Sequence, residues 1–369
     1  MLASEIENTR NRVLTVEDLR FDAPDLPVHM LQDFAAERFQ VRGDFVPLLG
    51  ERDQNFRITS PEGHQFVFKV SGHREAPDVV DFQVKALLHI GQRDTGLQVP
   101  RLVPGVDGNI VQNLRSGTGR HLVRMLTYLP GIPYDDGPAP SLEGLQDIGV
   151  FLARLATALE EFEHPAARHF MPWDICNGLI FNLQLQGLLP GSIIKMIQPS
   201  LSRLENDVYP GLASLRRQVI HQDGHGGNLL RQSATTESIA GMIDFGDMVE
   251  APLICDLAVS LASFVLEREE LEDIACALCR GFDSVIPLAI EETDLLLDLI
   301  IARLILNLQL FEFRRTQAAS VPDFVIDEQP AIIAALEKLI SLDRTAFNLA
   351  LREACRCNRP LTEATESTL

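Results

Sequence analysis

The segment Val219-Ile220-His221-Gln222-Asp223-Gly224-His225-Gly226-Gly227-Asn228, with Ile243-Asp244-Phe245-Gly246-Asp247 downstream, decides how this chain is interpreted. It combines an Asp, an Asn five residues later, and a second Asp followed by Phe-Gly. An enzyme that moves a phosphoryl group from a nucleotide to a hydroxyl needs these groups: one carboxylate near the acceptor, and an amide and a second carboxylate for Mg²⁺. Each motif alone is common by chance, but their order, each after a short apolar β-rich run, favours a phosphotransferase.

The length and composition of the chain are those of an ordinary globular protein. Its 369 residues suffice for two lobes with substantial cores, and 46% of them are hydrophobic against 23% charged. The longest apolar stretch, residues 295–310, contains Asp298, Arg303 and Asn307, so it predicts a buried helix rather than a membrane span. Charged residues interrupt the N-terminus where a secretory leader would be apolar, and we therefore expect a cytoplasmic protein.

The charge balance bears on the partners. The chain has 32 Lys and Arg against 52 Asp and Glu, a formal net charge of −20. A surface of this sign repels phosphate backbones and anionic lipids, so we expect neither nucleic acid nor a membrane as a partner. The acidity is compatible with a cationic acceptor, and it leaves the oligomeric state open.

The six cysteines show no repeating framework. Cys276 and Cys279 have the spacing of half a zinc site or of a redox pair, but they fall in a predicted helix, and no second Cys/His pair follows at ligand spacing. We therefore predict reduced structural thiols.

Apolar periodicity predicts mainly strands before residue 127 and mainly helices after it. The strands are expected at residues 43–49, 55–59, 65–70, 110–114 and 121–126, with helices at 26–39 and after Pro77. The later helices are expected at residues 142–161, 193–206, 258–267, 271–282, 292–313 and 331–351, and a β-hairpin around Asn228 and Asp244 interrupts them. Residues 128–133 break both periodicities and are expected to link two lobes.

These patterns divide the chain into four parts. We predict an N-terminal helical extension at residues 1–40 and a nucleotide-binding N-lobe at 41–127. A C-lobe at 128–357 would contain the catalytic loop and the metal and acceptor sites, and a C-terminal tail would follow at 358–369.

The order of these motifs resembles that of the aminoglycoside/choline-kinase-type phosphotransferases, relatives of the protein kinases, over residues 41–313. Within that superfamily, Leu49-Gly50-Glu51-Arg52-Asp53-Gln54-Asn55-Phe56 and the pair Trp173-Asp174 resemble the hydroxylysine-kinase-like branch. The resemblance implies an α+β, bilobal protein-kinase-like fold, with a small β-rich N-lobe and a larger, mainly helical C-lobe. It also implies Mg²⁺-dependent transfer of the γ-phosphoryl group of ATP or GTP to a small hydroxylated amine.

Asp223 is the predicted catalytic residue, because a carboxylate within hydrogen-bond reach of the acceptor hydroxyl orients it and takes its proton as the new P–O bond forms. Asn228 and Asp244 are the predicted metal ligands, since an amide oxygen and a carboxylate are hard donors that leave room for phosphate oxygens and water. A turn-forming Asp and a solvated turn are the alternatives for the two carboxylates. Asp247 fits a hydrogen-bonding turn residue better than a ligand.

Three more residues are assigned through the resemblance. His221 is similar to the family's catalytic-loop histidine, which braces the loop, and proton transfer is its alternative role. His225 lies inside the loop and is a candidate contact for substrate or phosphate, or an exposed histidine. Asp256 matches a family position that supports the catalytic loop through backbone hydrogen bonds.

Lys69 is the predicted phosphate-binding lysine. Strand alternation places it opposite Phe66, Phe68 and Val70, so its side chain would face the cleft and neutralise the α- and β-phosphates. A solvated strand lysine is the alternative. The usual partner in the family is a helical Glu, but the following helix offers Gln83 on its apolar arc, which would hold Lys69 through a neutral hydrogen bond.

Other nucleotide contacts are expected from the turn before residue 56 and from the linker. Gly50 is the only glycine of that turn, so Asp53 and Asn55 are candidates to contact phosphate. The backbone groups of Leu126 and Tyr128 are candidates to bind the base, and backbone groups do not distinguish adenine from guanine.

Trp173 and Asp174 are the predicted acceptor contacts, because an indole face and a carboxylate suit an ammonium group. A core Trp and a helix N-cap Asp are the alternative. We expect a hydroxylysine-like acceptor first, then homoserine, choline/ethanolamine or an aminoglycoside. A protein substrate is not expected, because residues 244–256 are too few for an activation segment. A catalytically silent nucleotide-binding module is the alternative of a different class.

Overall fold

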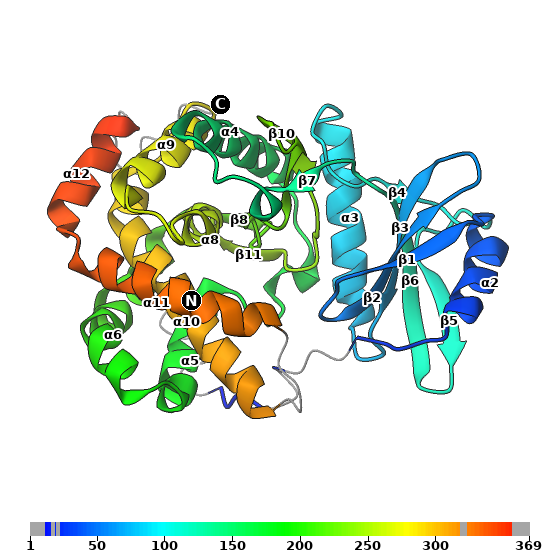
Figure 1. The fold of residues 1–369 in the computed structure, drawn as a ribbon, viewed down its shortest axis with the longest axis horizontal. Coiled ribbons are helices and arrows are strands. Elements are labelled where there is room, and N and C mark those ends of the chain that lie inside the picture. The colour runs from blue at the N-terminus through cyan, green and yellow to red at the C-terminus, as the bar shows by residue number, and fades with distance from the viewer. Residues whose placement is uncertain (1–11, 16–18, 20–22, 318–322, 356–369) are drawn as a thin grey trace.

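The computed structural model describes residues 12–15, 19, 23–317 and 323–355, which form two lobes (Figure 1). The N-lobe is built on an antiparallel sheet of six strands in the order β1-β2-β3-β6-β4, with β5 also paired to β6. The strands are β1 (Asp44–Leu48), β2 (Asp53–Thr59), β3 (Gln65–Ser71), β4 (Leu102–Val103), β5 (Gln112–Ser116) and β6 (Gly119–Thr127). The five expected strands are confirmed, and the two-residue β4 is too short to show a period in the sequence.

The β2–β3 hairpin sets the register of the sheet face that carries Lys69. Gly63 donates its N–H to the Ser60 carbonyl (2.9 Å) at a φ of 85°, a conformation that favours glycine. This turn pairs Thr59 with Gln65, and the pairs that follow place Asn55 opposite Lys69.

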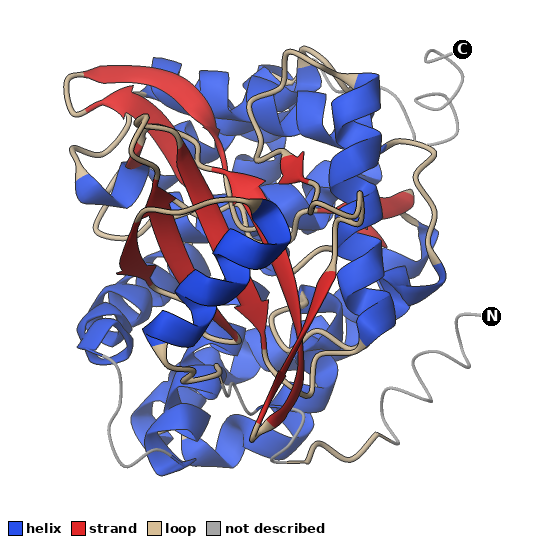
Figure 2. Cartoon of the chain, turned by 90° about the vertical axis from the view of Figure 1, so that its right-hand side faces the viewer, coloured by secondary structure: helices blue, strands red, loops and turns tan. Residues whose placement is uncertain are grey.

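The two faces of the sheet have different neighbours. Phe68 and Val70 point to the face covered by α2 (Val28–Phe39), where the rings of Phe39 and Phe68 meet edge to face at 6.2 Å. Figure 2 shows α2 lying across the near side of the sheet. Lys69 points to the opposite face, as predicted, where α3 (Pro77–Arg93) lies between the sheet and the C-lobe (Figure 1). The apolar side of α3 joins the core of the C-lobe through Val79, Phe82, Ala86, Leu87 and Ile90.

The C-lobe is mainly helical around one large apolar core. Its helices are α4 (Leu142–Leu159), α5 (Gly178–Leu185), α6 (Gly191–Arg203), α7 (Tyr209–Gly211), α8 (Ile254–Phe264), α9 (Leu271–Asp283), α10 (Ile290–Gln317), α11 (Asp323–Ser341) and α12 (Arg344–Ala354). The apolar stretch at 295–310 lies inside α10, most of whose side chains are buried there. The prediction of a buried helix is therefore confirmed.

One helix that was predicted as continuous is two helices in the structure. The pattern at residues 331–351 covers parts of two helices, because α11 ends at Ser341 and α12 begins at Arg344. Between them, the Asp343 carboxylate accepts the N–H groups of Thr345 (2.8 Å) and Ala346 (3.1 Å), which caps a new helix. Most of the predicted N-terminal extension before α2 and all of the tail at 358–369 lie outside the described residues, and the four-part division stays a prediction.

Two small antiparallel sheets in the C-lobe, one of three strands and one of two, carry the motifs. β9 (Leu229–Ser233) and β10 (Thr236–Met242) form the expected hairpin, and β7 (Ile132–Pro133) of the linker pairs with β9. β8 (Arg217–Ile220) pairs with β11 (Val249–Pro252). Because the first motif runs from the end of β8 to the start of β9, and the second begins just after β10, neighbouring strand ends bring the two motifs together.

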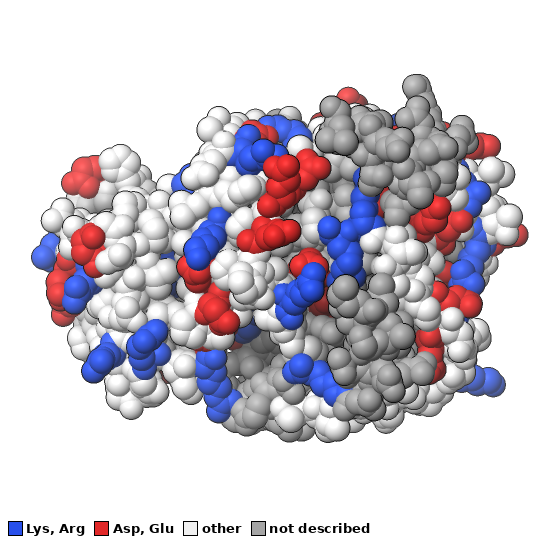
Figure 3. Space-filling model, turned by 180° about the vertical axis from the view of Figure 1, so that it is seen from behind, with Lys and Arg blue, Asp and Glu red and all other residues white. Residues whose placement is uncertain are grey.

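Three features bear on the expectations from composition. No helix among the described residues is both long and apolar enough to cross a bilayer. Within the same residues the cysteines are free thiols, namely Cys176, Cys255, Cys276, Cys279 and Cys355, and Cys357 lies outside them. On the face drawn in Figure 3, basic and acidic side chains are interspersed rather than gathered into one field of a single sign.

Candidate active site

The predicted catalytic loop, residues 221–228, is supported by Asp256 at the start of α8. Its carboxylate accepts the N–H of Gln222 at 2.7 Å and the N–H of His221 at 3.3 Å. Burial raises the pKa of Asp256 to about 6 in spite of these two bonds. Gln222 has a left-handed φ of 67°, which residues with a side chain rarely adopt, so the bonds to Asp256 hold a strained turn. The predicted supporting position of Asp256 is confirmed.

His221 connects the two motifs. Its ring is fully buried, with Nε2 donating to the Ile243 carbonyl (3.2 Å) and Nδ1 accepting the N–H of Asp223 (3.3 Å). The ring also lies edge to face with Phe245, at a centroid distance of 4.6 Å. Burial lowers the pKa of His221 to about 4, so the ring is neutral at pH 7, as this pair of bonds requires. These contacts are those of a brace between the two motifs.

Asp223 is partly buried, with 18% of its side chain exposed. Asn228 Nδ2 donates to Asp223 Oδ2 at 2.7 Å, while Arg303 lies 3.4 Å from Oδ1 and His225 Nε2 lies 3.5 Å from Oδ2. Burial alone would raise the pKa of Asp223, but His225 and Arg303 hold it well below its usual range. Burial likewise opposes the charge of His225, yet Asp223 and Asp135 raise its pKa to about 10. The loop therefore presents a fixed carboxylate anion to the cleft.

Asn228 and Asp244 meet at the ends of β9 and β10, where Ile243 donates its N–H to the Asn228 carbonyl (2.9 Å). Asp244 has a left-handed φ of 58° and its side chain is 49% exposed, so its carboxylate is accessible to a ligand in solution. The ammonium group of Lys69, at 3.1 Å, lowers the pKa of Asp244. Nδ2 of Asn228 is committed to Asp223, whereas its Oδ1 accepts no hydrogen bond from the described residues.

These two oxygen donors fit a small hard cation. One carboxylate and one amide oxygen match a metal that keeps water and phosphate oxygens as its remaining ligands. Within the described part of the chain, no group of three or more His, Cys, Asp or Glu is placed to hold a metal ion. The other ligands would therefore have to come from the nucleotide and from water.

Lys69 is held by the sheet rather than by α3. Its Nζ lies 3.1 Å from Asp53 Oδ2 on the neighbouring strand β2 and 3.1 Å from Asp244. Burial alone would lower the pKa of Lys69, but Asp244 and Asp53 keep it above its usual value. The predicted bond from Gln83 to Lys69 is wrong: Gln83 accepts from Arg124 (2.5 Å) and donates to the Gly246 carbonyl (3.0 Å). The lysine thus keeps a carboxylate partner, supplied by a strand.

The turn between β1 and β2 reaches across the cleft with two successive charged residues. Arg52 forms an ion pair with Asp247, and Glu51 forms a bidentate pair with Arg314 of α10 (2.8 and 2.7 Å). Inside the turn, Asn55 Nδ2 donates to the Leu49 carbonyl (3.3 Å). The side chains of Asp53 and Asn55, predicted as phosphate contacts, are therefore engaged with Lys69 and with the turn itself.

The comparison with known protein families agrees with this geometry. The family model described as "Phosphotransferase enzyme family" (APH) matches residues 44–288. The chain belongs to this phosphotransferase family. It is a kinase-like enzyme that takes a phosphoryl group from a nucleotide and transfers it to a hydroxyl group of a small molecule.

Individual relatives and solved structures match most of the length of this phosphotransferase. It is 27% identical over 316 residues to the hydroxylysine kinase of Danio rerio, covering 82% of this chain and 88% of that one. It is 28% identical over 280 residues to the hydroxylysine kinase of Mus musculus, covering 70% and 74%. The microcompartment-associated aminopropanol kinase matches with a TM-score of 0.67 and 18% identity, over 88% of this chain and 99% of that one. Amicoumacin kinase hAmiN matches with a TM-score of 0.65 and 14% identity, over 93% and 99%. The structural likenesses establish the bilobal protein-kinase-like fold.

In this phosphotransferase, Trp173 and Asp174 have the geometry of the alternative interpretation, a core Trp and a helix N-cap Asp. Asp174 is buried and accepts the N–H of Cys176 (2.9 Å), which caps the short helix Ile175–Asn177. The ring of Trp173 is also buried, and the guanidinium groups of Arg303 and Arg314 lie over it at 5.4 and 5.0 Å. The neighbourhood predicted to attract an ammonium group is therefore occupied by two cations of the chain itself.

The linker residues lie at the end of β6. Leu126 is paired on both sides, with Val67 of β3 and Leu102 of β4. The N–H of Tyr128 donates to the Gln65 carbonyl (3.2 Å), so that group is not available to a nucleotide base in this structure. Contacts of Leu126 and Tyr128 with a base stay a prediction.

Two side chains beside Asp223 and Asp247 were not identified from the sequence. Arg303, which pairs with Asp223, is one of the charged residues that interrupt the apolar stretch 295–310, and a buried charge in such a stretch is a signal of a partner. Arg52, which pairs with Asp247, lies in the turn quoted above, but its direction depends on how the lobes are placed.

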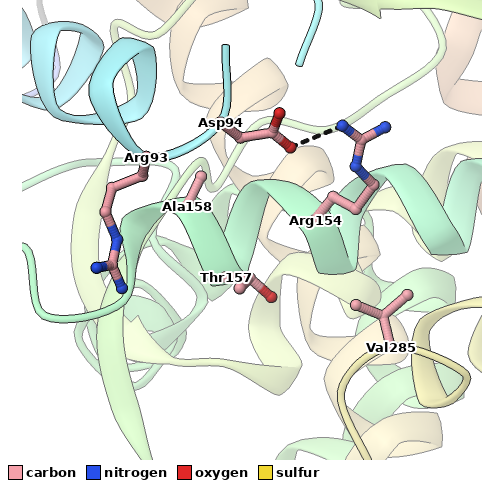
Figure 4. Close-up of a pocket in the computed structure, with 6 residues that line it drawn as sticks. All are labelled: Arg93, Asp94, Arg154, Thr157, Ala158 and Val285. Carbon is pink, nitrogen blue, oxygen red and sulfur yellow. Dashed lines mark hydrogen bonds and ion pairs between the residues drawn. The ribbon is translucent and has the colours of Figure 1, made fainter. Parts of the chain in front are cut away.

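A separate hollow of about 290 Å³ lies away from this site. It is lined by Arg93, Asp94, Arg154, Thr157, Ala158 and Val285 (Figure 4). Arg154 points to Asp94 and pairs with it at 2.7 Å, so these two charges satisfy each other. None of the motif residues lines this hollow.

Proposed function

We propose that this phosphotransferase transfers the γ-phosphoryl group of ATP or GTP, as the Mg²⁺ complex, to the hydroxyl group of hydroxylysine or a closely similar amino acid. The observation that carries the proposal is the Asp223 anion, held by Asn228 beside Asp244 and Lys69, in a chain similar over 82% of its length to a hydroxylysine kinase. The predicted ammonium site at Trp173 and Asp174 is not part of the proposal.

The chain's own residues divide the work between acceptor and donor. Asp223 orients the acceptor hydroxyl and, because its pKa is low, receives the proton as the new P–O bond forms rather than before it. Lys69 neutralises charge on the donor phosphates. Asn228 Oδ1 and Asp244 would hold Mg²⁺, which supplies further charge neutralisation at the phosphate oxygens when bound. His221 stays neutral and fixes the position of both loops.

The charges around Asp223 fit a zwitterionic amino acid. Hydroxylysine has an ammonium group on the carbon next to its hydroxyl. His225 lies between Asp223 and Asp135, and Asp135, whose side chain is 55% exposed, can pair with that ammonium group while His225 keeps its contact with Asp223. The α-carboxylate lies at the other end of hydroxylysine. Arg303 and Arg314, both over the Trp173 ring, are suited to a carboxylate. We therefore place the ammonium group beside Asp135 and the carboxylate toward Trp173.

A matched set of acceptors tests this proposal. Nucleotide consumption is measured with hydroxylysine, with 1,5-diaminopentan-2-ol (the same compound without its carboxylate), and with homoserine, choline, ethanolamine and kanamycin, and ³¹P NMR identifies the product. We expect the highest kcat/KM with hydroxylysine and a loss of about tenfold or more without the carboxylate, as for a charge-assisted hydrogen bond. A preference for choline, ethanolamine or kanamycin would contradict hydroxylysine as the acceptor but would leave phosphoryl transfer as the reaction. Nucleotide binding without turnover of any acceptor would support a silent module instead.

A further inference from the structure

The β1–β2 turn offers a guanidinium group where related nucleotide-binding turns offer glycine amides. A Cβ on Gly50 would lie 2.3 Å from the Asp53 carbonyl oxygen and 2.5 Å from Asn55 Nδ2, so the turn is tight and leaves no room for a side chain there. The two residues that follow carry long charged side chains, and both reach the C-lobe. The turn is therefore built to place these side chains rather than to wrap its own backbone around phosphates.

Arg52 lies at the second motif. Its Nη2 forms an ion pair with Asp247, and its Nη1 lies 3.7 Å from the sulfur of Met171. Asp247 is itself within electrostatic reach of both Asp223 and Asp244. The guanidinium thus lies on the C-lobe side of the cleft, although it belongs to the N-lobe.

Arg52 converges with Lys69 on the region around Asp244. A Cβ built on Gly246 would lie 3.1 Å from Arg52 Nη2, 3.1 Å from Asp244 Oδ1 and 4.0 Å from Lys69 Nζ. Two cations, one from the β1–β2 turn and one from β3, therefore approach one point beside the carboxylate assigned to the metal. Arg52 keeps 27% of its side chain exposed, so it is accessible to a ligand in the cleft.

We propose that Arg52 is a catalytic residue of the phosphoryl transfer, and that Asp247 holds it in position when no nucleotide is bound. In the reaction, the bond from the γ-phosphorus to the β,γ-bridging oxygen breaks and its electron pair stays on the nucleoside diphosphate. The acceptor oxygen forms the new bond to phosphorus, and its proton passes to Asp223. Arg52 forms no covalent bond and transfers no proton. It hydrogen-bonds the γ-phosphoryl oxygens and neutralises the charge that they carry in the transition state.

The chemistry of the side chain supports this assignment. A guanidinium presents a planar set of N–H donors that bind two phosphate oxygens together, which a lysine ammonium does not. An arginine supplied to a phosphoryl-transfer site contributes about 10³–10⁵-fold to kcat in other enzymes. The proposal rests on the phosphotransferase reaction and does not depend on which acceptor is used.

The test uses a transition-state mimic in place of an acceptor. Affinities for ADP or GDP, whichever binds, are measured by calorimetry with Mg²⁺, with and without aluminium fluoride, which mimics the transferring phosphoryl group. The variants are Arg52→Gln and Arg52→Lys, and Glu51→Gln is the matched control because it breaks the neighbouring bridge to Arg314 and leaves Arg52 in place. Thermal melting confirms that each variant is folded.

We expect aluminium fluoride to strengthen diphosphate binding by about tenfold or more in the wild type and in Glu51→Gln. Arg52→Gln should bind the diphosphate within about threefold of wild type and lose this gain, and Arg52→Lys should recover only part of it. Turnover with an acceptor should fall by at least about 10²-fold in Arg52→Gln. A full aluminium fluoride gain in Arg52→Gln would overturn the proposal. Equal losses in Arg52→Gln and Glu51→Gln would also overturn it, because they would make the turn only a bridge between lobes. The calorimetry contains no acceptor, so a wrong acceptor assignment leaves the aluminium fluoride result unchanged.

Discussion

Replacing Asp53 by Asn should weaken nucleotide binding, whereas replacing Gln83 should not. The Lys69 ammonium lies 3.1 Å from Asp53 Oδ2 and 3.1 Å from Asp244, and it has no bond to Gln83. Once a metal occupies Asp244, Asp53 is the carboxylate that remains for Lys69. The substitution removes that charge and keeps the size of the side chain.

The size of the effect follows from burial and charge. The side chains of Lys69 and Asp53 are only 16% and 12% exposed, so solvent screens their pair little. A hydrogen bond to a charged group contributes about 1.5–3 kcal/mol, and Asn keeps a neutral acceptor that recovers part of it. A loss of about 1–1.4 kcal/mol corresponds to nucleotide binding that is about five- to tenfold weaker.

The assay is calorimetry of nucleotide binding with Mg²⁺ for wild type, Asp53→Asn and Gln83→Met. Gln83→Met keeps the shape of the side chain and removes its bonds to Arg124 and to the Gly246 carbonyl. We expect this control to bind nucleotide within about twofold of wild type and to lose about 1–3 kcal/mol of unfolding free energy, because a buried guanidinium loses a partner. Wild-type affinity in Asp53→Asn together with tenfold weaker binding in Gln83→Met would refute the reasoning and restore the helical partner.

Three other substitutions, at Asp223, Asp244 and His221, test the site. Asp223→Asn should lower kcat by at least about 10²-fold and leave nucleotide affinity nearly unchanged, because we propose that Asp223 contacts the acceptor rather than the phosphates. Near-full turnover would remove Asp223 from the reaction. Asp244→Ala should abolish the Mg²⁺ dependence of nucleotide binding seen by calorimetry, and an unchanged dependence would place the metal elsewhere. The pKa of His221 is lowered to about 4. The contribution of the neutral His221 ring to the free energy of unfolding is therefore complete above pH 6.5 and is lost as pH falls toward 4. Urea unfolding of the wild type should show a loss about 2 kcal/mol larger between pH 7.5 and 5 than unfolding of His221→Gln, and equal losses would contradict the neutral buried ring.

Local patterns predicted those features that local geometry fixes. The two-residue period of β3 determined that Lys69 lies opposite Phe68 and Val70, because a strand cannot place neighbours on one face. The five-residue spacing from Asp223 to Asn228 determined that one short loop carries both, and their side chains bond each other. The Asp256 support followed from family resemblance, since nothing local connects it to residues 35 positions earlier.

The features that the sequence did not predict depend on contacts between distant elements. Periodicity placed Gln83 correctly on the buried side of α3, where it is 5% exposed, but the partner of that side chain depends on how α3 sits between the lobes. The partner of Lys69, by contrast, depends on the register of one hairpin. The turn after Thr59 fixes Asn55 opposite Lys69, and Asp53, two positions from Asn55, shares a face with that pair. For Trp173, residue type suggested a cation site, and the cations came from Arg303 and Arg314 of the same chain.

The way Lys69 is held also bears on how such an enzyme is controlled. Where the carboxylate partner of the phosphate-binding lysine lies on a helix, movement of that helix makes or breaks the pair and so switches the enzyme. Here the pair with Asp53 joins two strands of one hairpin, so its geometry does not depend on a residue of α3. Gln83 instead ties α3 to Arg124 of β6 and to Gly246 of the second motif, so the helix connects the lobes without holding the lysine. Together with only eleven residues between Asp244 and Asp256, this geometry favours a site that is complete as soon as its nucleotide binds.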